Sequence, residues 1–166
     1  MNSSPTKFLL HYRTLPWVFW LTAAISPLAW ADPGEDKAAI SQRLHTWAAA
    51  FNARDAAGVC DLFAPDLIAS VPGAPDADRD AVCGRLSTLL AKPGTSFHYS
   101  PEIHEIILDG DLAVVRLTWT LTTGQGAERQ RSQETGMDVF QRQADGRWSI
   151  IRFVAFPSGP DSPTAD

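Results

Sequence analysis

Apolar residues between positions 35 and 91 recur at every third or fourth position, which is the spacing of amphipathic helices. This pattern predicts three helices, over residues 35–53, 56–63 and 79–91. Asp55 is expected to cap the second helix and Pro65 to end it, while Asp78 or Asp80 is expected to cap the third. A short apolar run over 67–71 predicts a strand between the second and third helices.

After residue 96 the pattern changes to an alternation of apolar and polar side chains, the two-residue period of strands. It predicts four strands, over residues 97–108, 112–122, 129–142 and 147–156. Asp109-Gly110 and Asp145-Gly146 are expected to form two of the turns, because both residue types tolerate positive φ. A bulge is expected near Pro101. Helices followed by a run of antiparallel strands indicate an α+β fold, in which a curved antiparallel sheet wraps around an N-terminal helical layer.

The first 31 residues are typical of a secretory signal peptide. Lys7 and Arg13 precede an apolar run over 15–25, and Ala29-Trp30-Ala31 has the small-residue pattern of a cleavage site. We expect cleavage after Ala31 and a secreted or periplasmic product without stable membrane insertion. A permanent N-terminal anchor is the alternative, although the run is shorter than the about 20 residues of a membrane span. The chain then consists of a signal peptide (1–31), one domain (32–156) and a disordered tail (157–166).

Charge and cysteine content narrow the possible partners. Removal of residues 1–31 takes away Lys7 and Arg13 but no acid, which leaves 12 basic residues against 19 acidic ones and a net charge of −7. An acidic chain without a basic cluster is unsuited to nucleic acid or to an anionic membrane surface. Cys60 and Cys83 are the two cysteines. In an oxidising compartment they are expected to form a disulfide, with two buried free thiols as the alternative.

Four segments of the sequence have a characteristic order and spacing: residues 47–55, 62–66, 110–115 and 145–150. Together they resemble the nuclear transport factor 2-like superfamily, also called SnoaL-like or cystatin-like, and the resemblance covers the whole mature chain. It implies a cone whose internal pocket lies between the long first helix and the concave face of the sheet. It also implies a dimer through the convex face. The superfamily contains isomerases, epoxide hydrolases, dehydratases, cyclases and ligand-binding members, so the fold does not determine the function.

The resemblance assigns a role to Asp138. Aligned with ketosteroid isomerases, Asp138 takes the position of a protonated carboxylic acid that apolar surroundings keep neutral in an oxyanion hole. The tyrosine position of that hole is occupied by Trp47, whose indole N–H can donate a hydrogen bond. The position of the general base falls on Val71. The chain therefore resembles a ketosteroid-isomerase-like branch that lacks the general base.

Limonene epoxide hydrolases, which share this fold, provide a second comparison. Their Asp-Arg-Asp arrangement activates water, and Arg116 and Asp138 resemble two of its three members. Thr118 stands where the remaining carboxylate would be, and threonine cannot act as the base. An Arg–carboxylate pair of this kind has two interpretations. It is a cluster that orients a ligand or takes part in catalysis, or it is a buried ion pair whose two partners only neutralise each other. Both alternatives remain open.

Two assignments are possible for the faces of the strand over 112–122. Plain alternation buries its apolar face under the helices and exposes Arg116 and Thr118. The register implied by the resemblance instead places Arg116, Thr118, Glu134 and Asp138 in the pocket and leaves the apolar face to a second subunit. Under the second assignment, which we adopt, the chain is a homodimer. Its convex patch then contains Ala113, Val115, Leu117, Trp119, Leu121, Trp148, Ile150, Val154 and Phe156.

Apolar side chains are expected to line the pocket, as in most small-molecule sites. They are Trp47, Phe51, Val71, Phe140, Ile151 and Phe153, and for each of them ordinary core packing is the alternative. No cofactor and no metal are expected. His98 and His104 share a strand face with Glu102, but they are roughly 20 Å apart along the strand and cannot share one ion without a bulge or another partner.

These features favour an exported protein that holds a small molecule, apolar or of mixed polarity, between the first helix and the concave face of the sheet. The first alternative is an isomerase, dehydratase, cyclase or hydrolase that uses Asp138 as an acid or electrostatic stabiliser with Arg116 as its partner. In that case His45 or Glu134 would have to supply the base. A module that binds a partner through the convex sheet is the second alternative.

Overall fold

Three helices and six strands make up the part of the chain that the computed structural model describes, residues 32–94, 96–124 and 129–157. The helices are α1 (Pro33–Asn52), α2 (Ala56–Cys60) and α3 (Arg79–Leu90). The strands are β1 (Phe63–Ser70), β2 (Ala77–Asp78), β3 (Phe97–Asp109), β4 (Leu112–Thr123), β5 (Gln130–Arg142) and β6 (Trp148–Pro157). The expected signal peptide and disordered tail lie outside the described residues, apart from Pro157, which ends β6.

Each helix begins directly after an aspartate whose side chain accepts backbone N–H hydrogen bonds. Asp32 accepts from Gly34, Asp55 from Ala57 and Gly58, and Asp78 from Ala81. Asp55 and Asp78 are two of the caps that the sequence predicts. Among the described residues, no helix combines the length and the apolar composition that crossing a membrane requires.

The second helix is shorter than predicted, and Pro65 does not end it. α2 stops at Cys60, and β1 begins at Phe63 and runs through Pro65. Pairing between β1 and β6 is interrupted between Phe63 and Ile68. A proline is tolerated in such an irregular stretch, because no ladder hydrogen bond is needed from its nitrogen.

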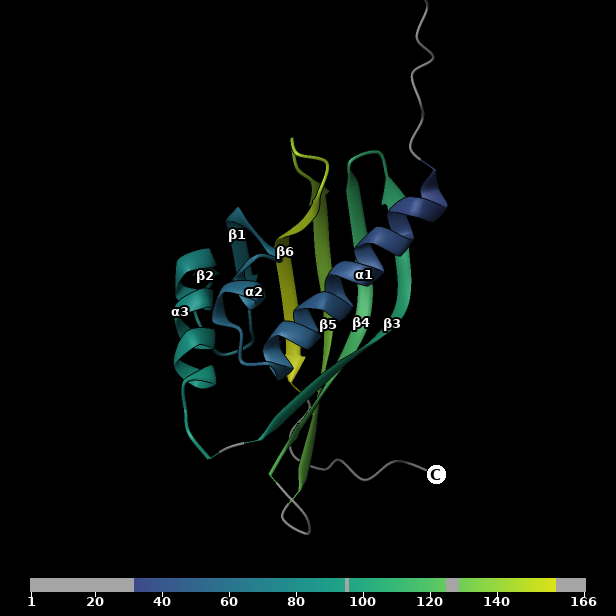
Figure 1. Ribbon diagram of the computed structural model, residues 1–166. Coiled ribbons are helices and arrows are strands. Elements are labelled where there is room, and N and C mark those ends of the chain that lie inside the picture. The colour runs from purple at the N-terminus through teal and green to yellow at the C-terminus, as the bar shows by residue number, and fades with distance from the viewer. Residues whose placement is uncertain (1–31, 95, 125–128, 158–166) are drawn as a thin grey trace, which may run out of the picture. The chain divides into compact units, whose positions relative to one another are not determined.

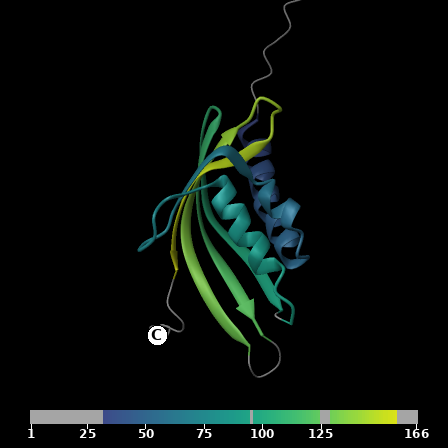
Figure 2. The same cartoon turned by 90° about the vertical axis from the view of Figure 1, so that its left-hand side faces the viewer.

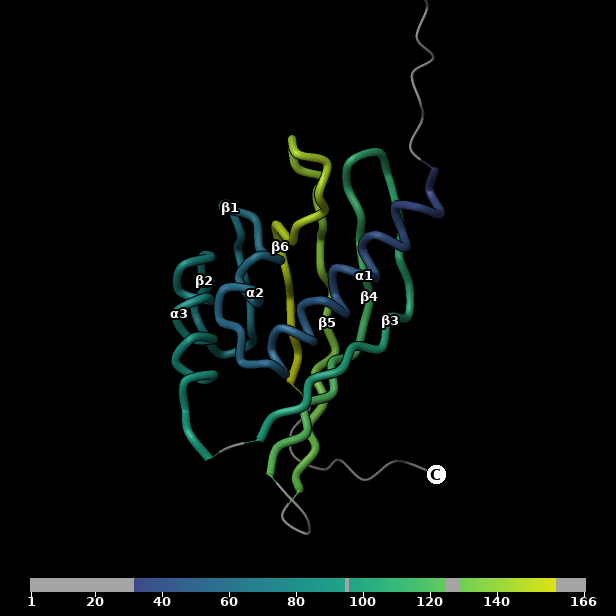
Figure 3. Tube along the Cα trace, in the orientation of Figure 1, coloured from purple at the N-terminus to yellow at the C-terminus, as the bar shows by residue number. Residues whose placement is uncertain are grey.

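The six strands form one sheet in the order β2-β1-β6-β5-β4-β3, in which β1 and β6 are parallel and all other neighbours are antiparallel. Figure 1 shows α1 lying across the strands, with α2 and α3 beside β1. The sheet is curved, and the helices cover its concave side (Figure 2). The Cα trace shows the same diagonal course of α1 over β3 to β6 (Figure 3). The α+β fold predicted from the sequence is confirmed.

The faces of β4 follow plain alternation, so the register implied by the resemblance is wrong for Arg116 and Thr118, although it places Glu134 and Asp138 on the concave face, where they lie. Ala113, Val115, Leu117 and Trp119 are buried, and they belong to one core with Ile40, Leu44 and Phe51 of α1. Arg116 and Thr118 lie on the opposite, convex face. The physical reason is that α1 needs an apolar sheet surface to cover, and only this face of β4 offers one.

A bulge in β6 changes the faces of that strand along its length. Val139 pairs with Arg152 but Phe140 pairs with Ile150, so Ile151 is an extra residue without a partner in β5. Ile150 and Phe153 therefore lie on the same concave side although they are three residues apart. Trp148 and Ile150, expected on the convex patch, are buried, whereas Val154 and Phe156 are exposed there as expected. In β3 the irregularity lies between Ile103 and Glu105, beyond the expected position at Pro101.

Asp36 anchors the start of α1 to the strands. Its carboxylate is 2.5 Å from Arg142 Nη2 and accepts a hydrogen bond from Trp148 Nε1 at 3.2 Å. Arg142 also donates to Asp111 in the β3–β4 turn and lies over the Trp148 ring, 4.5 Å from its centroid. This network connects α1 with two hairpins, and the hydrogen bond from Arg142 holds the pKa of Asp36 below its ordinary value.

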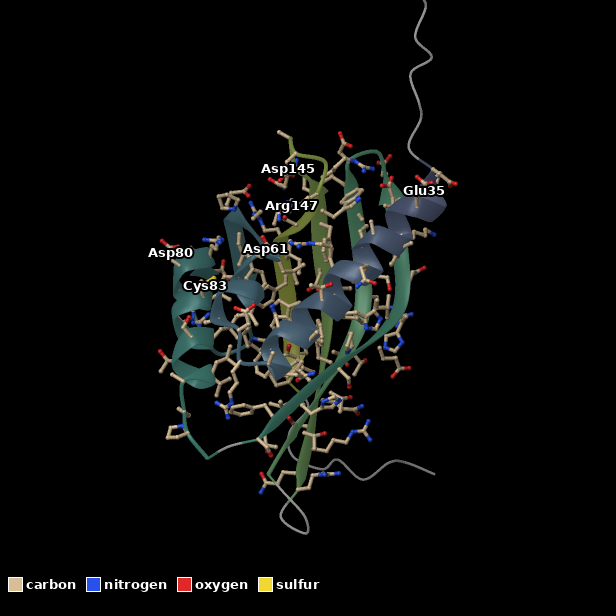
Figure 4. The ribbon with its side chains drawn as sticks, in the orientation of Figure 1. Glu35, Asp61, Asp80, Cys83, Asp145 and Arg147 are labelled. Carbon is tan, nitrogen blue, oxygen red and sulfur yellow. A yellow bond between two sulfur atoms is a disulfide. The ribbon has the colours of Figure 1, made fainter. Side chains whose placement is uncertain are left out.

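A second ionic network lies around Asp61, just before β1. Arg43 of α1 donates to the Asp61 carboxylate at 2.5 Å and to the Trp148 carbonyl at 3.0 Å. Arg147 donates to the other Asp61 oxygen at 2.9 Å and to Asp145 at 2.8 Å. Figure 4 shows Asp61, Asp145 and Arg147 grouped at one end of the molecule. The network joins α1, the α2–β1 connection and the β5–β6 turn.

Cys60 and Cys83 form a disulfide, as predicted, which connects the end of α2 with the middle of α3 (Figure 4). Their Cα atoms are 5.7 Å apart and their sequence separation is 23 residues. Closing a loop of this size stabilises a fold by about 3 kcal/mol in the chain-entropy model. The disulfide also restrains the position of Leu62 and Phe63, which are two and three residues after Cys60.

Replacing Asp36 with Asn should destabilise the protein by about 2 kcal/mol at pH 7, because Arg142 then loses a buried charged partner. The pKa of Asp36 is lowered in the folded state, so its contribution is present above the unfolded value of 3.8 and is lost as the pH falls through the folded value. Urea unfolding should therefore show a difference that shrinks below pH 4. Glu35→Gln, an exposed acid in the same turn, is the control, and an equal effect of both variants would contradict the prediction.

Candidate functional site

A cavity of about 80 Å³ lies between α1, the start of β1 and the concave face of the sheet. Residues from α1, from the α2–β1 connection and from strands β1, β3, β4, β5 and β6 form its wall. They are Trp47, Leu62, Phe63, Tyr99, Trp119, Glu134, Gly136, Asp138, Ile150, Phe153 and Ala155. Two acids and a tyrosine thus stand in a lining that is otherwise apolar and largely aromatic, the usual composition of a small-molecule site.

Asp138 is the most unusual residue of this wall. It lies in the middle of β5, where it pairs with Val115 of β4 and Phe153 of β6, and only 5% of its surface is exposed. Within the described residues no group donates a hydrogen bond to its carboxyl. No fully buried side-chain oxygen or nitrogen in that part of the chain lacks a partner. The Asp138 oxygens must therefore open onto the cavity instead of being sealed in the core.

The protonation of Asp138 follows from these surroundings. Burial raises its pKa to about 7, and the nearby charge of Glu134 adds to the rise. Desolvation disfavours the charged form of a carboxyl, and a like charge disfavours it further. Near neutral pH the group therefore exchanges between an acid that can donate a hydrogen bond and a carboxylate that can accept one.

Glu134 is the second acid of the cavity and lies four residues before Asp138 on the same face of β5. It pairs with Trp119 across β4 and is half-buried, and burial raises its pKa. Gly136 is the residue between the two acids on that face. Because Gly136 has no side chain, no side chain of β5 lies between the two carboxyls on that face. The pKa of the Tyr99 hydroxyl is also raised, chiefly by burial and then by Glu134, so this group stays protonated.

Aromatic rings form the side of the cavity beneath α1. The ring centroids of Trp47 and Trp119 are 4.9 Å apart, those of Trp47 and Tyr99 are 5.4 Å apart, and those of Tyr99 and Trp119 are 5.3 Å apart. Trp47 Nε1 donates to the Val59 carbonyl at 2.9 Å. The indole N–H of Trp47 is therefore engaged within the protein, and Asp138 has no donor at the position that the tyrosine takes in ketosteroid isomerases.

Four of the predicted site residues lie together in the cavity wall: Trp47, Glu134, Asp138 and Phe153. The other apolar residues expected in the lining do not reach it. Phe51 and Phe140 are buried in the adjoining core, Ile151 is the bulged residue of β6, and Val71 lies beyond the end of β1.

Arg116 and Thr118 are on the opposite face of the sheet from Asp138. Residues directly opposite each other in an antiparallel pair share a face, and Arg116 pairs with Met137, not with Asp138. The Arg116 side chain is 51% exposed and lies 3.9 Å from Glu105. The Thr118 hydroxyl is 2.8 Å from His104 Nε2. An Arg116–Asp138 pair is therefore not formed.

Several lining residues were missed by sequence reasoning. Tyr99 and Trp119 follow from the alternation of β3 and β4, which buries the side of Val115 and Leu117. The sequence pattern assigns Leu62 and Phe63 to the second predicted helix, whereas they lie in the α2–β1 connection and at the start of β1. Ile150 and Ala155 share the cavity only because of the bulge at Ile151. Within the described residues, no three His, Cys, Asp or Glu side chains are grouped to hold a metal ion.

The sequence model of a family described as "SnoaL-like domain" matches residues 44–151. None of the curated proteins compared with the chain matches it. Solved structures with the same fold are numerous. The stretch that the family model matches contains α1 from Leu44 onward, the disulfide and the cavity acids.

Three structures illustrate the likeness. A ketosteroid isomerase-like protein from Erwinia carotovora atroseptica is 22% identical with a TM-score of 0.63, over 76% of this chain and 98% of that one. A protein with a cystatin-like fold from Novosphingobium aromaticivorans is 18% identical with a TM-score of 0.63, over 77% and 85%. A protein from Catenulispora acidiphila, in complex with S-DNPA, is 17% identical with a TM-score of 0.65, over 75% and 94%. At these identities the likeness concerns the fold alone.

Replacing Asp138 with Asn should stabilise the protein at pH 8, by up to about 4 kcal/mol. Because the folded pKa of about 7 lies above the unfolded value of 3.8, stability from the protonated carboxyl is present below 3.8 and is lost as the pH rises towards 7. Asn imitates the protonated form, so the gain over wild type should grow between pH 4 and pH 7 in urea unfolding. Asp109→Asn, at an exposed position, is the control. A gain that does not change with pH would contradict the assignment.

Proposed function

The chain belongs to the SnoaL-like domain family, and from this premise we propose that it is an exported protein that binds a small molecule between α1 and the concave face of the sheet. The observation that carries the proposal is the unpaired carboxyl of Asp138, which opens onto a cavity with an aromatic wall. Burying an unpaired carboxyl costs free energy, so a ligand that bonds to it gains by relieving that cost.

The family supports ligand binding without specifying a ligand. The similar protein from Catenulispora acidiphila is in complex with S-DNPA. In this chain the cavity holds about 80 Å³, well below the roughly 300–1,000 Å³ of sites that enclose a drug-sized molecule. We infer that the cavity takes one end of the ligand and that the remainder extends through its open side.

Export is part of the proposal because the N-terminal sequence is typical of a signal peptide. Cleavage after Ala31 would leave Asp32 as the first residue. Asp32 caps α1 by accepting from the Gly34 N–H at 2.8 Å, so the processed chain would keep this cap. The disulfide between Cys60 and Cys83 fits an oxidising compartment.

Catalysis is a second candidate function, which the raised pKa of Asp138 favours. A general acid or base works best with a pKa near the working pH, and that of Asp138 is about 7. Arg116 cannot be its partner, because it lies on the other face. In an enzyme of this kind Glu134 would be the second group, with one acid protonated while the other is ionised.

Protein purified from its own cell envelope should retain a small molecule in native mass spectrometry. Ala155→Leu should abolish this, because the added carbons fill the cavity that Ala155 lines. Ala49→Leu makes the same change at an exposed position of α1 and should retain the molecule. Retention by both variants would place the ligand elsewhere and overturn the proposal. Chemical conversion of the molecule by wild type but not by Asp138→Asn would establish catalysis.

A second copy of this chain is the partner that we propose for the convex face. The apolar side chains there include the exposed residues Ile107, Met137, Val154 and Phe156. Glu105 and Arg116 lie beside them, 3.9 Å apart and both about half exposed. A two-fold axis brings the same patch against itself, so that apolar rows meet and the Glu105 of one copy faces the Arg116 of the other.

Met137→Glu should shift the protein from dimer to monomer in sedimentation velocity at micromolar concentration, because it places a charge in the centre of this patch. Gln133→Glu adds a charge to the same face of β5, away from the apolar rows, and should leave the dimer intact. Wild-type protein that sediments as a monomer would contradict the proposal.

A further inference from the structure

We propose that the cavity selects an ammonium head group, either a protonated amine or a quaternary ammonium, on a ligand whose apolar remainder lies outside. The proposal rests on the proposed function, since it requires that the cavity is a binding site. Three features of the wall carry it: the sign of its charged groups, its aromatic rings and its size.

The charged groups of the wall are both acidic. Glu134 and Asp138 line the cavity, and within the described residues no Lys, Arg or His side chain does. Two arginines beside wall residues donate to backbone carbonyls: Arg79 to those of Cys60 and Phe63, and Arg152 to those of Asp66 and Ile151. A carboxylate or phosphate would meet repulsion from both acids, whereas a cation would be attracted by both.

The aromatic rings add a second attraction for a cation. Trp47, Tyr99 and Trp119 form a continuous cluster in which each ring contacts the other two. Ring faces attract ammonium groups, most strongly those of Trp, and the attraction increases when the group is desolvated. Aromatic rings combined with acids, in a site that excludes most water, are the general means by which proteins hold ammonium groups.

The size of the cavity limits what enters. A cavity of about 150 Å³ is large enough for benzene, and this one holds about 80 Å³. Scaled from the six heavy atoms of benzene, the space takes about three or four heavy atoms, so an aminomethyl group with two heavy atoms fits and a trimethylammonium group with four fills it. Gly136 also lines this space, and a Cβ added there would lie 3.3 Å from the Val154 carbonyl oxygen, closer than an ordinary contact.

Because Asp138 gains and loses a proton near neutral pH, the proposal predicts how the affinity for a ligand changes with pH. The titratable groups facing Asp138 are Glu134 of β5 and Tyr99 of β3, while the wall residues from α1, β4 and β6 are apolar or aromatic. A cation stabilises the ionised form of Asp138, so its affinity should rise with pH. A neutral carbonyl that accepts from protonated Asp138 should instead bind more weakly as the pH rises.

Choline and 3,3-dimethylbutan-1-ol test the proposal, because they have the same shape and differ in charge. Calorimetry and tryptophan fluorescence, to which Trp47 and Trp119 should respond, measure both affinities. At pH 8 wild-type protein should bind choline about 10-fold more tightly than the alcohol, and choline affinity should rise between pH 6 and pH 8. The double variant Asp138→Asn, Glu134→Gln should lose the preference. Glu35→Gln, which removes an exposed acid from the first turn of α1, should keep it.

Equal or tighter binding of the alcohol, a choline affinity that falls with pH, or no choline binding at millimolar concentration would overturn the proposal. These outcomes are distinguishable from failure of the proposed function. If the alcohol or a molecule retained from cells binds wild type but not Ala155→Leu, the cavity is a binding site that does not select cations. If Ala155→Leu changes nothing, the cavity is not the binding site and both proposals fail.

Discussion

The carboxyl of Asp138 is held in apolar surroundings by backbone pairing on both sides, and this constraint organises the site. β5 is an interior strand, paired with β4 and β6 along most of its length. Asp138 therefore cannot turn to the convex face without breaking the register that also buries Phe140. The protein keeps a carboxyl where an apolar residue would be more stable. A position that weakens the fold and opens onto a cavity is typical of a functional residue.

The remainder of the structure supplies the stability that this arrangement requires. The apolar face of β4 packs under α1, and two ionic networks hold that helix, one through Asp36 and the other through Arg43, which contacts Asp61. The disulfide restrains the α2–β1 connection from the other side. These features lie around the cavity, not in it, so the wall itself is left with acids that have no partner among the described side chains. The bulge at Ile151 completes the wall by turning Ile150 and Phe153 to the same side.

Much of this could be predicted from the sequence, and the errors have identifiable causes. Helical spacing, aspartate caps and Asp-Gly turns are local signals, and they located α1, α3 and the four long strands to within a few residues. The resemblance places Asp138 and Glu134 in the pocket, and both line the cavity. The predicted face of Arg116 is wrong because the register implied by the resemblance disagrees with the apolar and polar alternation of β4 itself. The bulge at Ile151 could not be predicted, since it depends on pairing between two strands and has no Gly or Pro to mark it.

The most direct test of the account is the titration of the Asp138 carboxyl, followed by carbon-13 NMR in wild-type protein with labelled aspartate and assigned by comparison with Asp138→Asn. An unpaired, buried carboxyl beside Glu134 should titrate with a pKa near 7, and Glu134→Gln should lower that value by removing the neighbouring charge. A pKa near 4, unchanged by Glu134→Gln, would mean that Asp138 is solvated or paired. This result would contradict the central claim, which is that the Asp138 carboxyl is unpaired in the cavity and available to bind a ligand.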